Sequence, residues 1–378
     1  MSFTLSEVGR LSGASVIVFV RRFVDPERHA QGWRQTDVPH LDVRLIPGVG
    51  GRRFCLAMVR KYAGATHIMA GAFWDATLLY CLVCCCYRGL TVYLMTEPFS
   101  PIAAGYQKDS RWYIGLLKHL GRPILYRLWI KLLRSRLTGV FAISRLAQDQ
   151  YQRMGVPVSK IFPFGYFVPC AGDPTDCLGR HLSVEDTSDQ EFVLRLVFVG
   201  SLIHRKGVDL AIDAVRSVNR GNPLVLMDFY GPGDSTKFEF DGNTAIYKST
   251  IPFGCSQKVI ARYDALVLPS RYDGWGVVVN EALCAGTPVI CSSKAGAAEL
   301  VERFSAGVVF DPRGASSLAR AFRILLDEPT QLCFMRARAR TAIDEISPTV
   351  AAEYLLKILK GQVDAGTARS VWLNQRRP

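Results

Sequence analysis

The stretch RYDGWGVVVNEALCAGTPV, from Arg271 to Val289, decides the fold of this chain. It follows a predicted buried strand at Ala265–Leu268, and its glycines Gly274 and Gly276 permit close backbone approach and unusual φ values. The first N–H groups of a helix have no partners inside the helix and carry a partial positive charge, so they attract phosphates. A phosphate site is therefore predicted where a helix begins, at the amides of Gly276, Val277 and Val278.

Two acids flank this predicted phosphate site. Seven residues separate Asp273, before the turn, from Glu281, inside the helix. Carboxylates accept hydrogen bonds from vicinal hydroxyls in bidentate fashion, so the pair suits a sugar ring on one side and a ribose on the other. The same spacing also fits a strand-to-helix turn with a solvent-facing Asp and a capping Glu. The later Gly286, Thr287 and Pro288 extend the pattern and favour the ligand site.

Strand and helix patterns alternate along the whole chain, which predicts parallel sheets covered on both faces. The segment 170–190, rich in Gly, Asp, Ser and Thr, interrupts the alternation and is predicted to be a linker. We expect one doubly wound domain over residues 1–169, a second over 191–347, and a helix and tail over 348–378 that cross back to the first domain. Two such domains in tandem create a cleft between the carboxyl ends of their sheets, where ligands bind.

The start of the first domain departs from this plan. A doubly wound domain normally opens with a central strand and a glycine-rich turn, but here Phe3–Leu11 has a helical pattern and Ala14–Val20 reads as the next strand. We expect either a start codon upstream of Met1 or the loss of the central strand. An ordinary leading helix on a variant sheet is the alternative.

Three further segments carry a family pattern. They are FVGSLIHRKGVDLAIDAV (Phe198–Val215), DFYGPGD (Asp228–Asp234) and FAISRLAQDQYQRMGVPVSKIFPFGYFVP (Phe141–Pro169). With the Asp273–Glu281 spacing they resemble the retaining glycosyltransferases of family 4, the glycosyl transferases group 1, which have an E-x7-E signature. The resemblance implies an α/β chain with the GT-B fold, in which two Rossmann-like domains face each other across a cleft.

The resemblance also implies a role for each matching residue. Arg205 and Lys206 fall where the family places cations on the donor diphosphate, so they would both bind the donor and stabilise the leaving group. Glu281 would hold the ribose hydroxyls, and Asp273, which replaces the family's first Glu, would hold the donor sugar. Ser201 stands where many members have Arg. The other implied donor-binding residues are Gly200, Ser201, Gly231, Ile251, Gly274, Trp275, Gly276, Val277 and Val278.

The implied reaction is a front-face substitution with retention, in which the departing phosphate oxygen accepts the acceptor's proton. The resemblance implies no cofactor and no metal ion, with a nucleotide sugar as substrate. In the first domain, Glu97 follows a predicted strand and is assigned to acceptor or donor-sugar contact, with a surface acid as the alternative. His67, on the predicted strand Thr66–Ala70, is interpreted as a core residue.

Charge is concentrated in the first half of the chain. Residues 1–169 hold 22 basic and 9 acidic residues, a net of 22 − 9 = +13, whereas the remainder is balanced. The segment Arg111–Arg136 has seven Lys or Arg and no acid, and Pro123 is predicted to open a helix in it. Arg127, Lys131 and Arg134 lie on one stripe of that helix, with Ile124, Leu125, Leu128 and Leu132 on its apolar face and Trp112 and Trp129 at a headgroup boundary.

Such a helix suits an anionic membrane surface, and a sheet-covering helix with a solvated basic face is the alternative. No recognised module for nucleic acid accompanies the charge.

Eleven cysteines, four of them at Cys81, Cys84, Cys85 and Cys86, do not resemble a disulfide framework and suit a reducing cytoplasm. Neither a membrane span nor a signal peptide is expected.

The sequence thus predicts a cytoplasmic hexosyltransferase on the inner face of the plasma membrane. It would move a hexosyl unit from a UDP- or GDP-sugar to a lipid-linked saccharide during bacterial surface or exopolysaccharide synthesis. The alternative is a truncated or non-catalytic GT-B protein that binds a nucleotide sugar or a glycan without turnover. A GT-B epimerase is a third option, although such enzymes usually carry a different set of acids and histidines.

Overall fold

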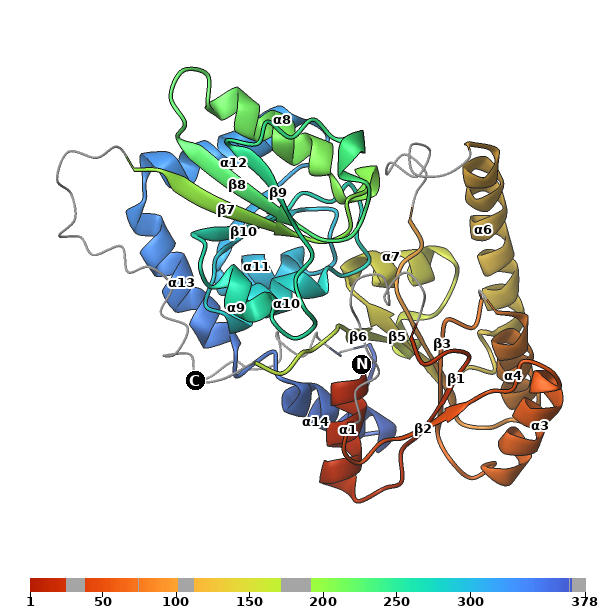
Figure 1. Cartoon of the computed structure of the whole chain (residues 1–378). Coiled ribbons are helices and arrows are strands. Elements are labelled where there is room, and N and C mark those ends of the chain that lie inside the picture. Colours follow the sequence, from red (N-terminus) through yellow and green to blue (C-terminus); the bar gives the residue numbers. More distant parts are fainter. Residues whose placement is uncertain (25–37, 74, 101–111, 171–191, 367, 369–378) are drawn as a thin grey trace.

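Parallel strands form the centre of both halves of the chain in the computed structural model (Figure 1). The structure describes residues 1–24, 38–73, 75–100, 112–170, 192–366 and 368, with only the backbone for 112–120. The predicted linker at 170–190 lies outside the described residues, except for Cys170.

The second half contains a six-stranded sheet in the order β12-β11-β10-β7-β8-β9, in which every pair is parallel. Its strands read as near-continuous apolar runs because helices cover both faces. Of the six strands of this sheet, only β12 was not predicted from the sequence. The strands are β7 (Leu194–Val199), β8 (Val225–Tyr230), β9 (Ala245–Ser249), β10 (Ala265–Leu268), β11 (Val289–Ser292) and β12 (Gly307–Phe310).

Two helices pack on one face of this sheet and four on the other (Figure 1). Those on the first face are α8 (Val208–Val218) and α12 (Ala315–Asp327). Those on the second are α9 (Ser256–Ile260), α10 (Val277–Cys284), α11 (Ala298–Phe304) and α13 (Thr330–Ala342).

The strands of the first half fall into two separate parallel sheets among the described residues. One pairs β1 (Ile17–Val20) with β2 (Asp42–Leu45), and the other has the order β3-β4-β5-β6. The parallel strands agree with the predicted fold class, although β1 and β3 do not pair among the described residues. The four-stranded sheet comprises β3 (His67–Ala70), β4 (Val92–Thr96), β5 (Gly139–Ile143) and β6 (Ile161–Phe164).

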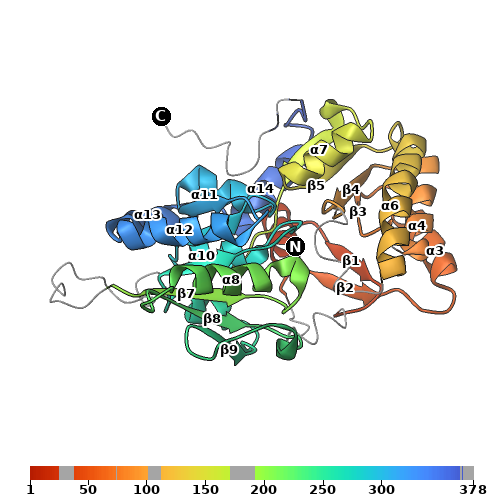
Figure 2. The same ribbon diagram turned by 90° about the horizontal axis from the view of Figure 1, so that it is seen from above.

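Helices cover both faces of the four-stranded sheet. Side chains such as Leu94 and Val140 bury one face with four helices, and Tyr93 and Phe141 bury the other with the two terminal helices. Figure 2 shows α3, α4 and α6 on the side of the first domain that lies away from the second. The helices are α1 (Ser2–Ser12), α3 (Gly51–Lys61), α4 (Ala76–Tyr87), α6 (Trp112–Leu133), α7 (Arg145–Arg153) and α14 (Pro348–Leu359).

Two of these helices bear on expectations from the sequence. Pro123 lies inside α6 and does not begin a new helix, so that prediction is wrong. A proline removes one intrahelical hydrogen bond, and the buried anchors Ile130 and Leu133 hold α6 on the sheet beyond it. At the other end of the chain, α14 packs against α1 and adds Leu355 to the core around Phe164.

The cysteines are not all free thiols. Cys170 and Cys284 form a disulfide that joins the end of the first domain to the last residue of α10. The expectation of wholly reduced cysteines is therefore wrong for this pair, which is 114 residues apart in sequence and becomes adjacent only in the fold. Cys85 and Cys86 are buried on α4, and burial raises the pKa of the Cys86 thiol to about 11.

Candidate active site

The turn before α10 has the shape that the sequence predicts. Gly276 has φ +94°, and a Cβ atom there would lie 2.6 Å from the Leu268 side chain, so the position favours glycine. The helix begins at Val277, and within the described chain no side chain caps its N-terminus. Its first N–H groups and the positive end of its dipole lie directly after Asp273 and Gly274 in the chain.

Asp273 is the best-fixed acid of the site. Its Oδ2 atom lies 2.6 Å from Lys206 Nζ, and the two side chains are 11% and 19% exposed. Burial alone would raise the pKa of the Asp273 carboxyl, but the charges of Lys206 and Arg205 and the Lys206 hydrogen bond bring that pKa below its ordinary value. The predicted acid and the predicted cation are thus in direct contact.

A second ion pair, which was not predicted from the sequence, holds the loop that carries Arg205 and Lys206 in place. Arg271 donates to both carboxylate oxygens of Asp209 at 2.6 and 2.7 Å, and to the carbonyl of His204 at 2.6 Å. The Arg205 guanidinium in turn donates to the carbonyl of Tyr272 at 2.9 Å. These contacts fix the short helix His204–Lys206 against the β10–α10 turn. Arg271 could have been noticed in the sequence, because it is the first residue of the Arg271–Val289 stretch.

Glu281 lies on α10, about one turn beyond the N-terminus of the helix. Burial raises the pKa of its carboxyl, and a hydrogen bond with the Ser256 side chain opposes that rise. A carboxylate in such surroundings favours a ligand whose hydroxyls replace the lost water.

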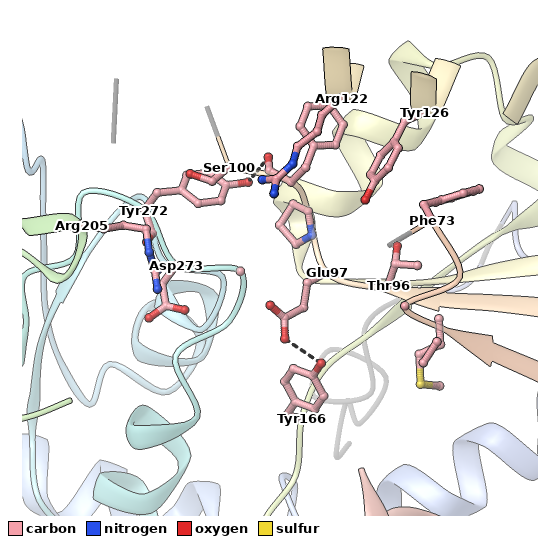
Figure 3. Close-up of a pocket in the computed structure, with 16 residues that line it drawn as sticks. Phe73, Thr96, Glu97, Ser100, Arg122, Tyr126, Tyr166, Arg205, Tyr272 and Asp273 are labelled. Carbon is pink, nitrogen blue, oxygen red and sulfur yellow. Dashed lines mark hydrogen bonds between the residues drawn. The ribbon is translucent and has the colours of Figure 1, made fainter. Parts of the chain in front are cut away.

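A cavity of about 370 Å³ lies between the two domains (Figure 3). Its wall on the second domain includes Arg205, Tyr272, Asp273 and Gly274. Its wall on the first domain comes from the ends of β3 and β4 and from α6, with Tyr166 at the side. The first-domain lining is Ala70, Gly71, Phe73, Met95, Thr96, Glu97, Pro98, Phe99, Ser100, Arg122, Tyr126 and Tyr166.

Glu97 points into this cavity, with Tyr166 beneath it (Figure 3). The Tyr166 hydroxyl donates to Glu97 Oε1 at 2.7 Å. A Cβ atom on Gly274 would lie 2.6 Å from Glu97 Oε2 and 3.1 Å from Glu97 Cβ, so a larger residue there would displace the Glu97 side chain. The structure thus brings Glu97 beside the Asp273–Gly274 turn of the other domain.

Hydrogen bonds continue from this contact into α10. The indole of Trp275, which is 1% exposed, donates to Asn280 Oδ1 at 2.8 Å, and the Asn280 amide donates to the carbonyl of Tyr166 at 3.0 Å. Trp275 is therefore a core side chain. The contact between Tyr166 and Asn280 was missed because the two residues are 114 apart in sequence.

The other residues singled out in the sequence lie elsewhere. Gly200 and Gly231 approach each other closely where β7 and β8 end, and Ser201 and Ile251 follow in neighbouring loops outside the cavity lining. His67 is half-buried on β3, and burial lowers its pKa. On α6, Arg127 and Lys131 are exposed, Arg134 donates to the Gly155 carbonyl at 2.8 Å, and the side chain of Trp112 lies outside the described residues.

Comparison with known proteins finds a family model that matches most of the second domain. Residues 190–342 match the family model described as "Glycosyl transferases group 1". The glycogen synthase of Mycobacterium tuberculosis (strain CDC 1551 / Oshkosh) is 34% identical over 154 residues, which are 39% of this chain and 36% of that protein. The alpha-D-kanosaminyltransferase of Streptomyces kanamyceticus is 24% identical over 248 residues, 63% of this chain and 62% of that protein. The chain thus spans less than two thirds of either relative's length.

Solved structures extend the likeness to both domains. Anabaena Alr3699/HepE, solved in complex with UDP, has a TM-score of 0.68 to this chain at 15% identity and covers 95% of this chain and 96% of its own. This similarity is one of fold. It confirms the predicted architecture of two Rossmann-like domains facing each other across a cleft.

Proposed function

Because this chain has the GT-B fold and a group 1 glycosyl transferase domain in its second half, we propose that it is a retaining glycosyltransferase that uses a nucleotide sugar. One observation carries the proposal. Asp273 and Arg205 line the interdomain cavity, Lys206 pairs with Asp273 at 2.6 Å, and α10 begins four residues after Asp273, at Val277. The side chains of Arg205 and Lys206 and the first N–H groups of α10 suit a diphosphate. The carboxylates of Asp273 and Glu281 suit sugar hydroxyls.

The donor in this proposal is a UDP- or GDP-sugar with a hexosyl group. Its diphosphate would lie between the α10 amides and the side chains of Arg205 and Lys206. Glu281 would accept from the ribose, and Asp273 would accept from the sugar. UDP in the crystal of the Anabaena protein supports a nucleoside diphosphate in this fold.

The proposed chemistry needs no base from the protein. The phosphate oxygen that leaves the sugar would accept the proton of the incoming hydroxyl on the same face, which retains the anomeric configuration. Two cations and a helix N-terminus would stabilise the negative charge on the departing diphosphate, and stabilisation of developing charge is usually the largest catalytic contribution. No metal ion or cofactor takes part in this proposal.

A lipid-linked saccharide is proposed as the acceptor, with the enzyme held at the membrane by α6. The helix exposes an apolar stripe, in which Ile124 is 69% and Leu128 is 52% exposed, while Tyr126 and Ile130 pack inward. Arg127 and Lys131 are exposed among these residues. An apolar stripe with basic neighbours suits the anionic surface of a cytoplasmic leaflet. Among the described helices, none is both long and apolar enough to span a membrane.

The proposal is tested by a donor screen followed by a transfer assay. Thermal shifts with UDP-, GDP- and ADP-sugars identify the base, and the product of transfer or hydrolysis is followed by proton NMR of the anomeric centre. Retained configuration is expected, and an inverted product would contradict the mechanism. Glu281→Gln keeps the shape and loses the charge, so kcat/KM for the donor should fall about 10- to 100-fold. Wild-type kcat/KM in that variant would refute the role of Glu281.

A further inference from the structure

The first-domain wall of the cavity carries a guanidinium beside aromatic rings. Arg122 and Tyr126 are four residues apart on α6, so they share one face of the helix, and both line the cavity. The Tyr126 ring lies 4.8 Å from that of Phe73 and 5.4 Å from that of Phe99. Burial raises the pKa of the Tyr126 phenol, so it stays neutral. Arg122 therefore brings a positive charge to an otherwise aromatic part of the wall.

Two acids, Glu97 and Asp273, also line the cavity. Glu97 accepts from Tyr166, and Asp273 pairs with Lys206 at 2.6 Å. Figure 3 shows the Arg122 side chain entering the cavity beside Ser100, whereas Glu97 points to the opposite end, toward Tyr166. A ligand that fills the cavity from the donor side toward α6 would thus meet the carboxylate first and the guanidinium last.

Resting on the proposed function, we propose that the acceptor carries a carboxylate or phosphoryl group and that Arg122 is the residue that selects it. A guanidinium binds two oxygens of such a group at once, which a neutral hydroxyl cannot match. Aromatic rings around the guanidinium lower the local dielectric constant and strengthen the attraction. The anion has two chemical sources, the carboxylate of a uronic sugar and the phosphoryl group of a lipid carrier.

Three small probes separate these sources. Methyl β-glucuronide carries a carboxylate, glucose 1-phosphate carries an anomeric phosphoryl group, and methyl β-glucoside is the neutral match. Their affinities are measured by calorimetry with and without saturating UDP. One of the two anions should bind at least about tenfold tighter than the glucoside, as a charged bidentate contact implies. The preferred anion names the source.

Variants at Arg122 test whether this residue causes the preference for an anionic probe over the glucoside. Arg122→Gln should bring the ratio of anion to glucoside affinity to within about twofold, and Arg122→Lys, which keeps the charge without the fork, should lie between. Arg153→Gln, an exposed arginine on α7, is the matched control and should keep the wild-type ratio. The proposal is overturned if wild type binds the anions no better than the glucoside, or if Arg122→Gln keeps the preference.

The UDP titration keeps this result apart from the proposed function. UDP affinity should be unchanged in Arg122→Gln, and a loss of UDP affinity would place Arg122 on the donor and overturn the acceptor role. Failure of wild type to bind any nucleoside diphosphate would instead sink the proposed function. The probe affinities measured without UDP would still decide whether Arg122 selects an anion.

Discussion

Asp273 and Lys206 are the residues on which the candidate site depends most. Asp273 was singled out from the glycine turn, and Lys206 was implied by the family resemblance. Their direct contact at 2.6 Å could not be predicted, because the partners are 67 residues apart and the ion pair forms only when two loops meet. The same limit explains why Arg122, Tyr166 and Asn280 were missed.

Lys206→Met tests this pair at the level of single residues. It leaves the Asp273 carboxylate buried without its closest cation, which should destabilise the fold by about 3 kcal/mol in chemical denaturation. Nucleotide affinity should fall more than tenfold as well. The double variant Lys206→Met/Asp273→Asn removes both charges and should recover most of the stability but none of the affinity. Full affinity in the double variant would show that Lys206 does not contact the nucleotide.

Helices α10 and α6 differ in how much of their structure could be predicted from the sequence. The start of α10 was predicted from glycines, because a positive φ at Gly276 is a local property that the sequence records. The continuity of α6 through Pro123, in contrast, was not predicted. Pro123 suggested a boundary, whereas packing of Ile130 and Leu133 on the sheet keeps the helix continuous. Whether an apolar stripe faces a core or solvent is decided by the neighbours, which the sequence of one helix does not contain.

Vesicle flotation tests the role assigned to α6. Wild type should float with vesicles of phosphatidylglycerol and phosphatidylethanolamine and stay behind with purely zwitterionic ones, because each basic residue near an anionic surface contributes about 1 kcal/mol. Reversal of Arg127 and Lys131 to Glu, or Leu125→Gln with Leu128→Gln, should release it. Arg134 is left intact since it also binds the Gly155 carbonyl.

Reversal of Arg320 and Arg323, exposed on α12 of the second domain, is the matched control for charge and should leave flotation unchanged. If wild type ignores anionic vesicles, or if the α12 reversal releases it equally, α6 is not the membrane surface.

At the scale of the whole molecule, the two domains meet through contacts on both sides of the cavity. The backbone N–H of Arg145, at the start of α7, donates to Glu299 of α11 at 3.1 Å. Burial raises the pKa of Glu299 to about 7, and the Arg145 hydrogen bond and charge oppose that rise. The fold of each domain was largely predictable from strand and helix periodicity, whereas contacts between domains, including the Cys170–Cys284 disulfide, depend on their docking.

Glu299 makes stability depend on pH near neutrality. Its carboxyl holds a proton in the folded state up to about pH 7 but loses it above about pH 4.5 when unfolded. Folding stability from this group is therefore full below pH 4.5 and decreases as the pH rises to 7, by roughly 2–3 kcal/mol. Glu299→Gln should flatten the melting temperature between pH 5 and pH 7.5, as followed by calorimetry. Parallel pH profiles for both proteins would contradict this.

The central claim is that the α10 turn receives the diphosphate of a nucleotide. Calorimetric titration of wild type with the best nucleoside diphosphate and with its parent nucleoside tests it most directly. The diphosphate should bind at least about 100-fold tighter, since two cations and a helix N-terminus contact only the phosphates. Equal affinity for the nucleoside and the diphosphate would contradict the account.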